Sequence, residues 1–576
     1  MARGLTSLPS ELLQQILSEL NGTEIARCST ICHSVHNIVL HSQRLQYLIQ
    51  LQLAGMVDIQ SNCSNTATKL AMIRNYSTAA FCPKPQYMFV QKVPYVRCYA
   101  ERRFRSSEVE VLFAHGILAQ RIMDGPKNSM IYLCQLPSEM RQIEKVAMDP
   151  SQDLLFTVLS KGSMVYGSAF SIFTGLTHPL ASPKLEDVIL VPESCHTSVS
   201  ICGDEILIFA DWEDERDDEE IDGPYYLCKS YQITIFNWRT GDINVAISVP
   251  SYDSYRMSEE LDVFTLSADV HEYEQALFLD QNHIAIATVI HDNCDFFPTA
   301  SINTIDIQQL RRTQSILDST VSFELPTPEE GMAYLATCSI TCGHPGAPGF
   351  EVSSLSPTQF PQPPFGFESE DTILAFNWSY SLRYGSQAGP YSGFIPISRL
   401  LSLYPREVEN RKKKRIPWVE WGPLNTRVLH KTLFLDGMVY GSRALICQSD
   451  GLYNDELRSL ISVVDIGDAA RRRAISQRGQ GTVAVDYVSG ETEIVLPYIA
   501  GAGGKYTCGK AIATSLPYCI YQVDIPIQHS IHEHGFAAYL NEDVVVLKVP
   551  ANPDDLLDSD YDFHLFSFSG DTKAAL

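Results

Sequence analysis

The stretch LPSELLQQILSEL, residues 8–20, decides the fold at the N-terminal end of the chain. Its apolar residues recur at helical spacing, so they form one stripe along a short helix. Pro9 suits the first helical position, where a missing N–H costs nothing, and Glu11 lies where the helix dipole favours a carboxylate. Asn21 and Gly22 are typical of a helix end. The stripe comprises Leu8, Leu12, Leu13, Ile16, Leu17 and Leu20.

Two further helices are expected downstream. Thr23 can cap a second helix that runs through Cys32, and Ser42 can cap a third that ends before Gly55. Residues 1–55 are too few to build a strong core alone, so such a module relies on a partner or on the rest of the chain. The pattern leaves two interpretations open, a helical cap on a larger domain and a docking module.

This part of the chain resembles an F-box motif. The resemblance is carried by Leu-Pro-x-Glu at its start and by the blocks at residues 27–28, 31–35 and 42–45. At Val35 the family pattern often has a bulky aromatic residue instead. The resemblance implies a three-helix module that binds the small SKP-type adaptor of cullin-RING ubiquitin ligases. The residues it implies for the module's core and adaptor surface are Leu8, Pro9, Glu11, Leu12, Ile16, Leu17, Leu20, Cys32 and Val35.

The rest of the chain is predicted to be mainly β, after a helical linker over residues 56–84. A unit recurs in which a turn rich in Asp, Asn or Gly precedes four to seven apolar residues, often β-branched. Because repeated strand pairs must stack to bury both faces, a β-propeller-like domain over residues 85–576 is the expected architecture. The units are SQDLLFTVL, CGDEILIFADW, DQNHIAIATVI, ESEDTILAFNW, YGSRALICQ and NEDVVVLKV.

The segment YQITIFNWRTG, residues 231–241, has the strand–Trp–turn ending of WD-like blades. With VAMDPSQDLLFTV and PWVEWGP, it resembles the propeller-like C-terminal region of many fungal F-box proteins. The markers of the repeated unit are spaced more widely than the roughly 40–50 residues of one four-stranded blade. Long insertions or unmarked blades are therefore expected between them.

Composition and charge narrow the class of protein. The 576 residues are 45% hydrophobic and 19% charged, which are globular values, and the formal net charge is −25. Such a charge disfavours a nucleic-acid partner, since phosphate binding needs a basic surface. We expect neither a membrane-spanning helix nor a signal peptide. The fifteen cysteines have no framework spacing and favour reduced thiols in a cytoplasmic or nuclear protein.

Motifs that would carry catalysis or bind a cofactor are weak. The segment GKYTCGKA at residues 504–511 has Ala511 where a phosphate loop needs a hydroxyl, and no helix is expected after it. The Cys and His clusters at residues 28–32, 338–344 and 529–534 lack the four ligands of a structural zinc site. No Gly-x-Ser-x-Gly elbow occurs. We expect no catalytic residue, no metal and no cofactor.

Two charge runs remain. The acidic run DWEDERDDEEID, residues 211–222, is predicted to be a solvated loop that can also attract a basic partner. The basic run RKKKR, residues 411–415, is either a nuclear import signal or contact with an acidic substrate, or an exposed loop.

The sequence as a whole predicts a non-catalytic substrate-recognition subunit of a cullin-RING ligase. Its helices would bind the adaptor and, through it, the cullin, while the β-domain would hold an unidentified target protein near the conjugating enzyme. Two alternatives stay open: a scaffold that acts outside any ligase, and an enzyme or ligand-binding propeller with a site at its axial mouth.

Overall fold

The structure is a computed structural model, and it describes the helices, the strands and their shorter connections. The described residues are 8–58, 65–79, 86–93, 117–120, 131–134, 143–149, 152–161, 164–171, 176–187, 196–215, 227–250, 256–257, 264–265, 270–291, 298–315, 319–326, 333–342, 365–367, 372–382, 387–404, 414–430, 432–433, 439–448, 460–467, 486–488, 493–495, 499–500, 512–523, 537–540, 544–550 and 561–567.

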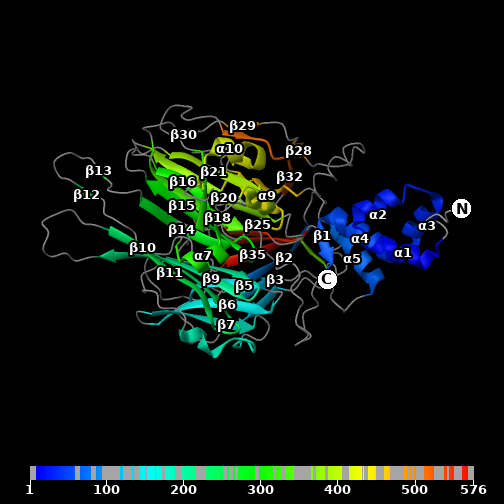
Figure 1. Cartoon of the computed structure of the whole chain (residues 1–576), viewed down its shortest axis with the longest axis horizontal. Helices are drawn as coiled ribbons and strands as arrows, with labels where there is room; N and C mark the ends of the chain where they lie inside the picture. Colours follow the sequence, from blue (N-terminus) through cyan, green and yellow to red (C-terminus); the bar gives the residue numbers. More distant parts are fainter. Residues whose placement is uncertain are drawn as a thin grey trace.

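The N-terminal residues form a helical module that projects from one side of a β-rich body (Figure 1). Two hydrophobic clusters hold this module together. One lies among the first four helices and the other between the fourth and fifth, around Tyr47, Leu51 and Ile73. The helices are α1 (Ser10–Ser18), α2 (Gly22–Cys28), α3 (His33–His41), α4 (Gln43–Ala54) and α5 (Thr66–Ala79).

The helix boundaries correct the sequence-based expectation of three helices before residue 55, because there are four. Asn21, expected to end α1, instead caps α2, and its side chain forms a reciprocal capping box with Glu24. Cys32 is the N-cap residue of a separate helix, α3. The prediction of a third helix between Ser42 and Gly55 is confirmed, since Ser42 caps α4 and Gly55 ends it with a φ of 67°.

Among the described residues, the β-rich body contains six sheets of three or more strands. Sheet 1 has the strand order β5 (Ile143–Asp149), β6 (Leu154–Lys161) and β7 (Met164–Ser171), and sheet 2 has β8 (His196–Cys202), β9 (Glu205–Glu215), β10 (Leu227–Asn237) and β11 (Ile243–Pro250). Sheet 3 has β14 (Val270–Phe278), β15 (His283–His291), β16 (Pro298–Asp306), β17 (Thr320–Glu324) and β22 (Lys414–Ile416), and sheet 4 has β18 (Ala333–Cys342), β20 (Ile373–Leu382), β21 (Gln387–Pro396) and β23 (Arg427–His430), with β30 (Ile499–Ala500) beside β21.

Sheet 5 has β24 (Thr432–Leu433), β26 (Arg443–Gln448), β27 (Leu460–Asp465), β32 (Tyr518–Val523) and β28 (Asp486–Val488), with β25 (Val439–Tyr440) beside β26, and sheet 6 has β33 (Ala537–Leu540), β34 (Val544–Pro550), β35 (Tyr561–Ser567) and β2 (Gln86–Val93).

Shorter elements complete the described part of the chain. The two-stranded pairs are β1 (Met56–Asp58) with β19 (Phe365–Phe367), β3 (Ile117–Gln120) with β4 (Ile131–Cys134), β12 (Arg256–Met257) with β13 (Phe264–Thr265), and β29 (Glu493–Val495) with β31 (Ile512–Thr514). Short helices are η3 (Pro183–Asp187), α7 (Ile307–Thr313), α9 (Ile397–Ser402) and α10 (Trp418–Asn425). None of the described helices is both long enough and apolar enough to cross a lipid bilayer.

The six recurring units of the sequence occupy equivalent places in the fold. Each supplies the second strand of one sheet, namely β6, β9, β15, β20, β26 and β34. In sheets 2 to 4 the first four strands form an antiparallel meander in chain order, and in sheet 3 the fifth strand, β22, pairs in parallel with β17. The recurring units of the sequence thus correspond to equivalent strands in six sheets.

The second strands are continuous apolar runs because both of their faces are covered. In β15, Ile284 and Ile286 pack in a cluster with residues of sheet 2, whereas Ala285 and Ala287 pack in a cluster with residues of sheet 4. All four side chains are fully buried. Alternate residues of one strand thus face two neighbouring sheets, which is why the strand has no polar face.

The sheets pack against one another in chain order. The first strands of sheets 1 to 4 make successive contacts, from β5 to β8, β8 to β14 and β14 to β18. In sheet 5 it is β25, beside β26, that contacts both β18 and β33, the first strand of sheet 6. Among the described strands, none of the sheets closes on itself. At the far end of the series, β35 pairs with β2, so that a strand next to the helical module completes the last sheet of the chain.

Both charge runs differ from expectation at their described residues. Residues 211–215 of the acidic run, predicted to be loop, are the last part of β9 and pair with β10. Lys414 and Arg415 of the basic run lie in β22, which pairs in parallel with β17. In both strands, pairing with a neighbour provides hydrogen-bond partners for the backbone N–H and C=O groups. A run of charged side chains is therefore not enough to predict a loop. Residues 216–222 and 411–413 lie outside the described residues.

Candidate functional site

The helical module carries the candidate site, and its core fixes the side of each helix that faces solvent. The core cluster comprises Leu17, Ile25, Val35, Val39 and Leu45, all at most 5% exposed. Helix α1 packs against α3 and α4, and α2 packs against α4. Leu13 and Leu17 are the buried residues of α1, so the face of α1 away from them lies at the surface.

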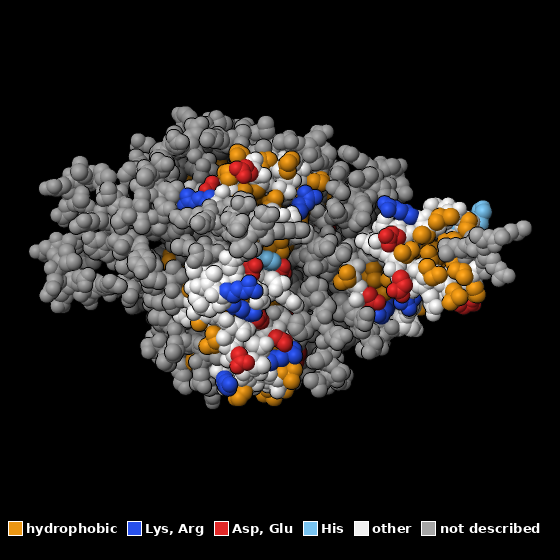
Figure 2. All heavy atoms as spheres, viewed as in Figure 1, with side chains coloured by type: hydrophobic (Ala, Val, Ile, Leu, Met, Phe, Trp, Pro, Cys, Tyr) orange, Lys and Arg blue, Asp and Glu red, His pale blue; other side chains and the backbone are white. Residues whose placement is uncertain are grey.

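That surface carries large apolar side chains, whereas the surface of a helix is ordinarily polar. Leu12 and Ile16, one turn apart on α1, are 46% and 44% exposed. Ile31, just before α3, and Leu40, near the end of α3, are 71% and 55% exposed. Hydrophobic side chains gather on the helical module in Figure 2. We call Leu12, Ile16, Ile31 and Leu40 the exposed apolar set.

The structure divides the predicted adaptor-binding residues into two groups. The core group contains Leu17 and Val35, which are buried, and Leu20 and Cys32, which are partly buried against the same cluster. The surface group contains Pro9, Glu11, Leu12 and Ile16, which are exposed, with half-buried Leu8 beside them. Pro9 is the N-cap residue and not the first helical residue, since α1 begins at Ser10.

Ile31 and Leu40 were missed by the sequence analysis. Their exposure depends on where α2 ends and α3 begins, and that break was not predicted. With one helix running to Cys32, an apolar residue at position 31 fits a buried stripe. The informative signal in the sequence is the surplus of apolar residues in α1 and α3 beyond what a core stripe needs.

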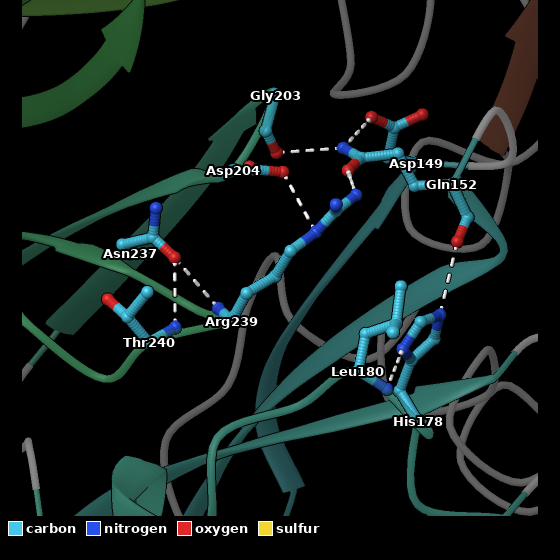
Figure 3. Close-up of polar contacts among 9 residues, drawn as sticks. All are labelled: Asp149, Gln152, His178, Leu180, Gly203, Asp204, Asn237, Arg239 and Thr240. Atoms are coloured by element: carbon cyan, nitrogen blue, oxygen red, sulfur yellow. Dashed lines mark hydrogen bonds and ion pairs between the residues drawn. The ribbon is translucent and has the colours of Figure 1, made fainter. Parts of the chain in front are cut away.

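A second cluster of polar side chains lies where turns of sheets 1 and 2 meet (Figure 3). Gln152 Nε2 donates to Asp149 Oδ2 and to the Gly203 carbonyl, both at 2.7 Å. Arg239 Nη2 donates to Gln152 Oε1 at 3.0 Å, and Arg239 Nε lies 3.0 Å from Asp204 Oδ1. These contacts join three turns of two sheets.

The third of those turns follows the WD-like strand β10. Asn237 Oδ1 accepts hydrogen bonds from the backbone N–H groups of Arg239 and Thr240, at 2.9 and 3.0 Å, which closes the turn before β11. The Trp238 indole is fully buried in the cluster between sheets 1 and 2, and the guanidinium of Arg239 lies over its ring at 5.0 Å. The turn therefore presents Arg239 to the neighbouring sheet.

His178 completes this junction. Its Nε2 lies 3.2 Å from the Gln152 carbonyl, and its Nδ1 accepts the backbone N–H of Leu180 at 3.2 Å, which makes the ring the neutral tautomer with hydrogen on Nε2. Its ring meets that of Trp238 edge-on, with centroids 4.8 Å apart. Burial lowers the pKa of His178, and the carbonyl of Gln152 opposes that shift.

This polar cluster has the chemistry of a structural junction. Burial raises the pKa of Asp204, while Arg239 opposes that shift. Arg239 contacts the side chains of both Gln152 and Asp204, so these side chains are used to join the turns. Within the described residues, no group of three or more His, Cys, Asp or Glu side chains is placed to hold a metal ion.

Some predicted motifs cannot be placed. Residues 504–511 and 529–534 lie outside the described part of the chain, as does His344 of the Cys–His cluster. Cys338 and Cys342, four residues apart, both lie on β18.

Comparisons with known proteins add one assignment. Residues 5–45 match the F-box-like family. This F-box-like domain spans α1 to α3 and the first residues of α4, and it contains the exposed apolar set, whereas Leu53 of α4, 43% exposed, lies outside it. The comparison with curated proteins finds no match.

Solved structures give weak likenesses over the longer part of the chain. One is the crystal structure of polysaccharide lyase Uly1, with 8% identity, a TM-score of 0.27, and coverage of 78% of this chain and 94% of that one. Another is sucrose-6-phosphate hydrolase from Lactobacillus gasseri, with 7% identity, a TM-score of 0.23, and coverage of 91% and 99%. TM-scores this low carry no argument about fold or activity.

Proposed function

We propose that this chain is a substrate-recognition subunit of a cullin-RING ubiquitin ligase, with the F-box-like domain as its adaptor-binding part. The observation that carries the proposal is the coincidence of that domain with the exposed apolar set. A set of large apolar side chains on a packed helical module is typical of an interface that a partner covers. The partner is an SKP-type adaptor, through which the chain reaches the cullin.

In this proposal the chain contributes no catalytic group. The β-domain binds a target protein and the F-box-like domain binds the adaptor, so the target is held near the ubiquitin-conjugating enzyme at raised effective concentration. The polar cluster at His178 supports a non-catalytic role, because its side chains are used to join two sheets. The described cysteines, which are free thiols, support a cytoplasmic or nuclear site of action.

The β-rich body is proposed to be a β-propeller. Three observations support this architecture: equivalent second strands in six sheets, packing of the sheets in chain order, and pairing of β2 with β35. Electron cryomicroscopy of the adaptor-bound protein tests it. Views along one axis should show sheets arranged radially around a centre, whereas two layers of stacked sheets would contradict a propeller.

The adaptor interface is tested by placing charges on the exposed apolar set. Leu12→Asp combined with Ile16→Asp would bury unpaired carboxylates in the complex, so we expect adaptor affinity to fall at least about tenfold for each substitution. Gln14→Asp is the matched control, since Gln14 is exposed on the same helix but lies two residues from both Leu12 and Ile16 and so on a different face. Affinity is measured by titration with purified adaptor, and circular dichroism confirms that the helices remain.

Two outcomes would overturn the assignment. Unchanged affinity in the double variant would show that the adaptor binds another surface of the protein. Failure of the wild-type chain to capture adaptor and cullin from cytosol would favour the alternative in which the helices serve a scaffold outside any ligase.

A further inference from the structure

Strand β1 belongs to the helical module. Met56 is 3% exposed and lies in the hydrophobic cluster formed by α4 and α5, next to Leu51 and Leu70. The Asp58 carboxylate accepts a hydrogen bond from Lys69 Nζ of α5 at 3.0 Å. Burial and the same carboxylate raise the pKa of Tyr47 on α4 above its usual value, which places Asp58 next to that ring as well. Both ends of β1 are thus fixed to helices.

The partner of β1 is joined by the chain to the β-rich body. Strand β19 pairs antiparallel with β1 in the register Met56 with Phe367, Val57 with Gly366, and Asp58 with Phe365. It lies in the connection between β18 and β20, the first two strands of sheet 4. Figure 1 shows β1 between the helices and the β-rich body.

The length of chain after β19 limits how far it can move from sheet 4. Five residues separate Phe367 from Ile373, the first residue of β20. Six steps along an extended chain span about 20 Å at most. Thr372 is buried, and Ile373 N–H donates to the Gly441 carbonyl of sheet 5 at 3.0 Å, so the near end of this connection is held.

We propose that the β1–β19 pair is a strap that holds the helical module in one orientation on the β-rich body. A covalent linker alone would let the two parts rotate about its free backbone dihedrals, whereas a second attachment removes most of that freedom. If the chain has the proposed function, on which this inference rests, the strap sets the direction in which a bound target faces the conjugating enzyme. It makes β19 a positioning element.

A disulfide across the register tests whether the pair exists in solution. Residues directly opposite in an antiparallel pair have Cα atoms about 4.5–5.5 Å apart, within the range a disulfide bridges. Val57→Cys with Gly366→Cys should therefore form a 57–366 bond under mild oxidation, detected by peptide mass spectrometry. Each single variant is a control against bonds to native cysteines. Absence of the 57–366 bond in the oxidised double variant would overturn the strap.

Breaking the strap tests its effect. Gly366→Pro removes a backbone N–H and fixes the φ angle at about −65°, which disfavours the extended geometry of an antiparallel strand. Gly366→Ala keeps the N–H and is the matched control. Small-angle X-ray scattering of the full chain should show a larger maximum dimension for the proline variant alone. A scattering curve identical to wild type would contradict a positioning role.

The two proposals fail separately. Because β1 lies outside the F-box-like domain at residues 5–45 and packs with α4 and α5, the proline variant should still bind adaptor as wild type does. If the proline variant changes the scattering but the wild-type chain binds no adaptor, the strap is supported and the proposed ligase function is wrong. In a reconstituted ligase, the proline variant should spread self-ubiquitination over lysines that the wild type leaves unmodified.

Discussion

At the scale of single residues, His178 shows how burial makes a side chain sensitive to acid. Its Nδ1 accepts a backbone hydrogen bond, so protonation would place a second N–H against that of Leu180. Since burial lowers the pKa in the folded state, the unfolded chain binds the proton more readily. The stabilising contribution is therefore complete above the ordinary value of 6.5 and is lost as pH falls below it.

We expect the β-rich body to melt at lower temperature at pH 5.5 than at pH 7.5, and His178→Gln to reduce that difference. The variant is less stable at both pH values, because it loses the contacts with Trp238 and Leu180. Thermal melts of both proteins at the two pH values measure the effect. Equal pH dependence in wild type and variant would rule out His178 as a source of it.

Buried thiols give a second prediction at this scale. Burial raises the pKa of Cys202 to about 12 and that of Cys519 to about 12, and both side chains are at most 5% exposed. At pH 8 their thiolate fraction falls roughly a thousand-fold below that of an ordinary cysteine. Iodoacetamide should leave both unmodified in the native protein and label both after unfolding, as followed by peptide mass spectrometry. Rapid labelling of either in the native state would contradict their burial.

At the scale of elements, the repeated unit has a recurring closing contact. The residue after the third strand donates its N–H to a carbonyl in the turn before the second strand, as Ile307 does to Asn282 at 2.8 Å. The same contact joins Trp238 to Asp204, Ile397 to Thr372 and Ile466 to Ser442, at 2.9–3.0 Å. Because the bond joins backbone atoms, residues of different types can occupy these positions. This explains why no strict motif marks the repeat in the sequence.

The close packing of β20 against β21 gives a prediction for one strand pair. A Cβ added to Gly393 would lie 2.2 Å from the fully buried ring of Phe376. Gly393→Ala should therefore lower the free energy of unfolding by about 1–3 kcal/mol. Phe376→Leu makes room for the methyl group, so the double variant should cost less than the sum of the single variants in urea unfolding. Additive costs would show that the two residues do not contact each other.

The elements differ in how well the sequence specified them. The second strands were predictable, because continuous apolar runs bounded by turn residues are a strong signal. The break between α2 and α3 was not, since Ile31 and Cys32 continue the apolar pattern across it. The adaptor-binding set was correspondingly mixed: periodicity identified Leu12 and Ile16 as part of the helix but does not tell an exposed apolar residue from a core one.

At the scale of the whole molecule, the decisive contacts join residues far apart in the sequence. Gln86 lies opposite Ser567 where β2 pairs with β35, and Val57 lies opposite Gly366 where β1 pairs with β19. The apolar pattern of a strand specifies which face is buried but not which strand lies beside it. The sequence could therefore predict the repeated unit, while the order and attachment of the sheets required the structure.

The β2–β35 pair predicts that residues before the first sheet stabilise the last one. A chain beginning at residue 95 lacks β2 and leaves β35 with an unpaired edge, exposing its backbone N–H and C=O groups. We expect its melting temperature to fall by about 5 °C or more, with aggregation and faster hydrogen exchange in β35. A chain beginning at residue 85 is the control, because it loses the helical module but keeps β2. If the two truncated chains melt at the same temperature, the pairing of β2 with β35 contributes nothing to the stability of the β-rich body.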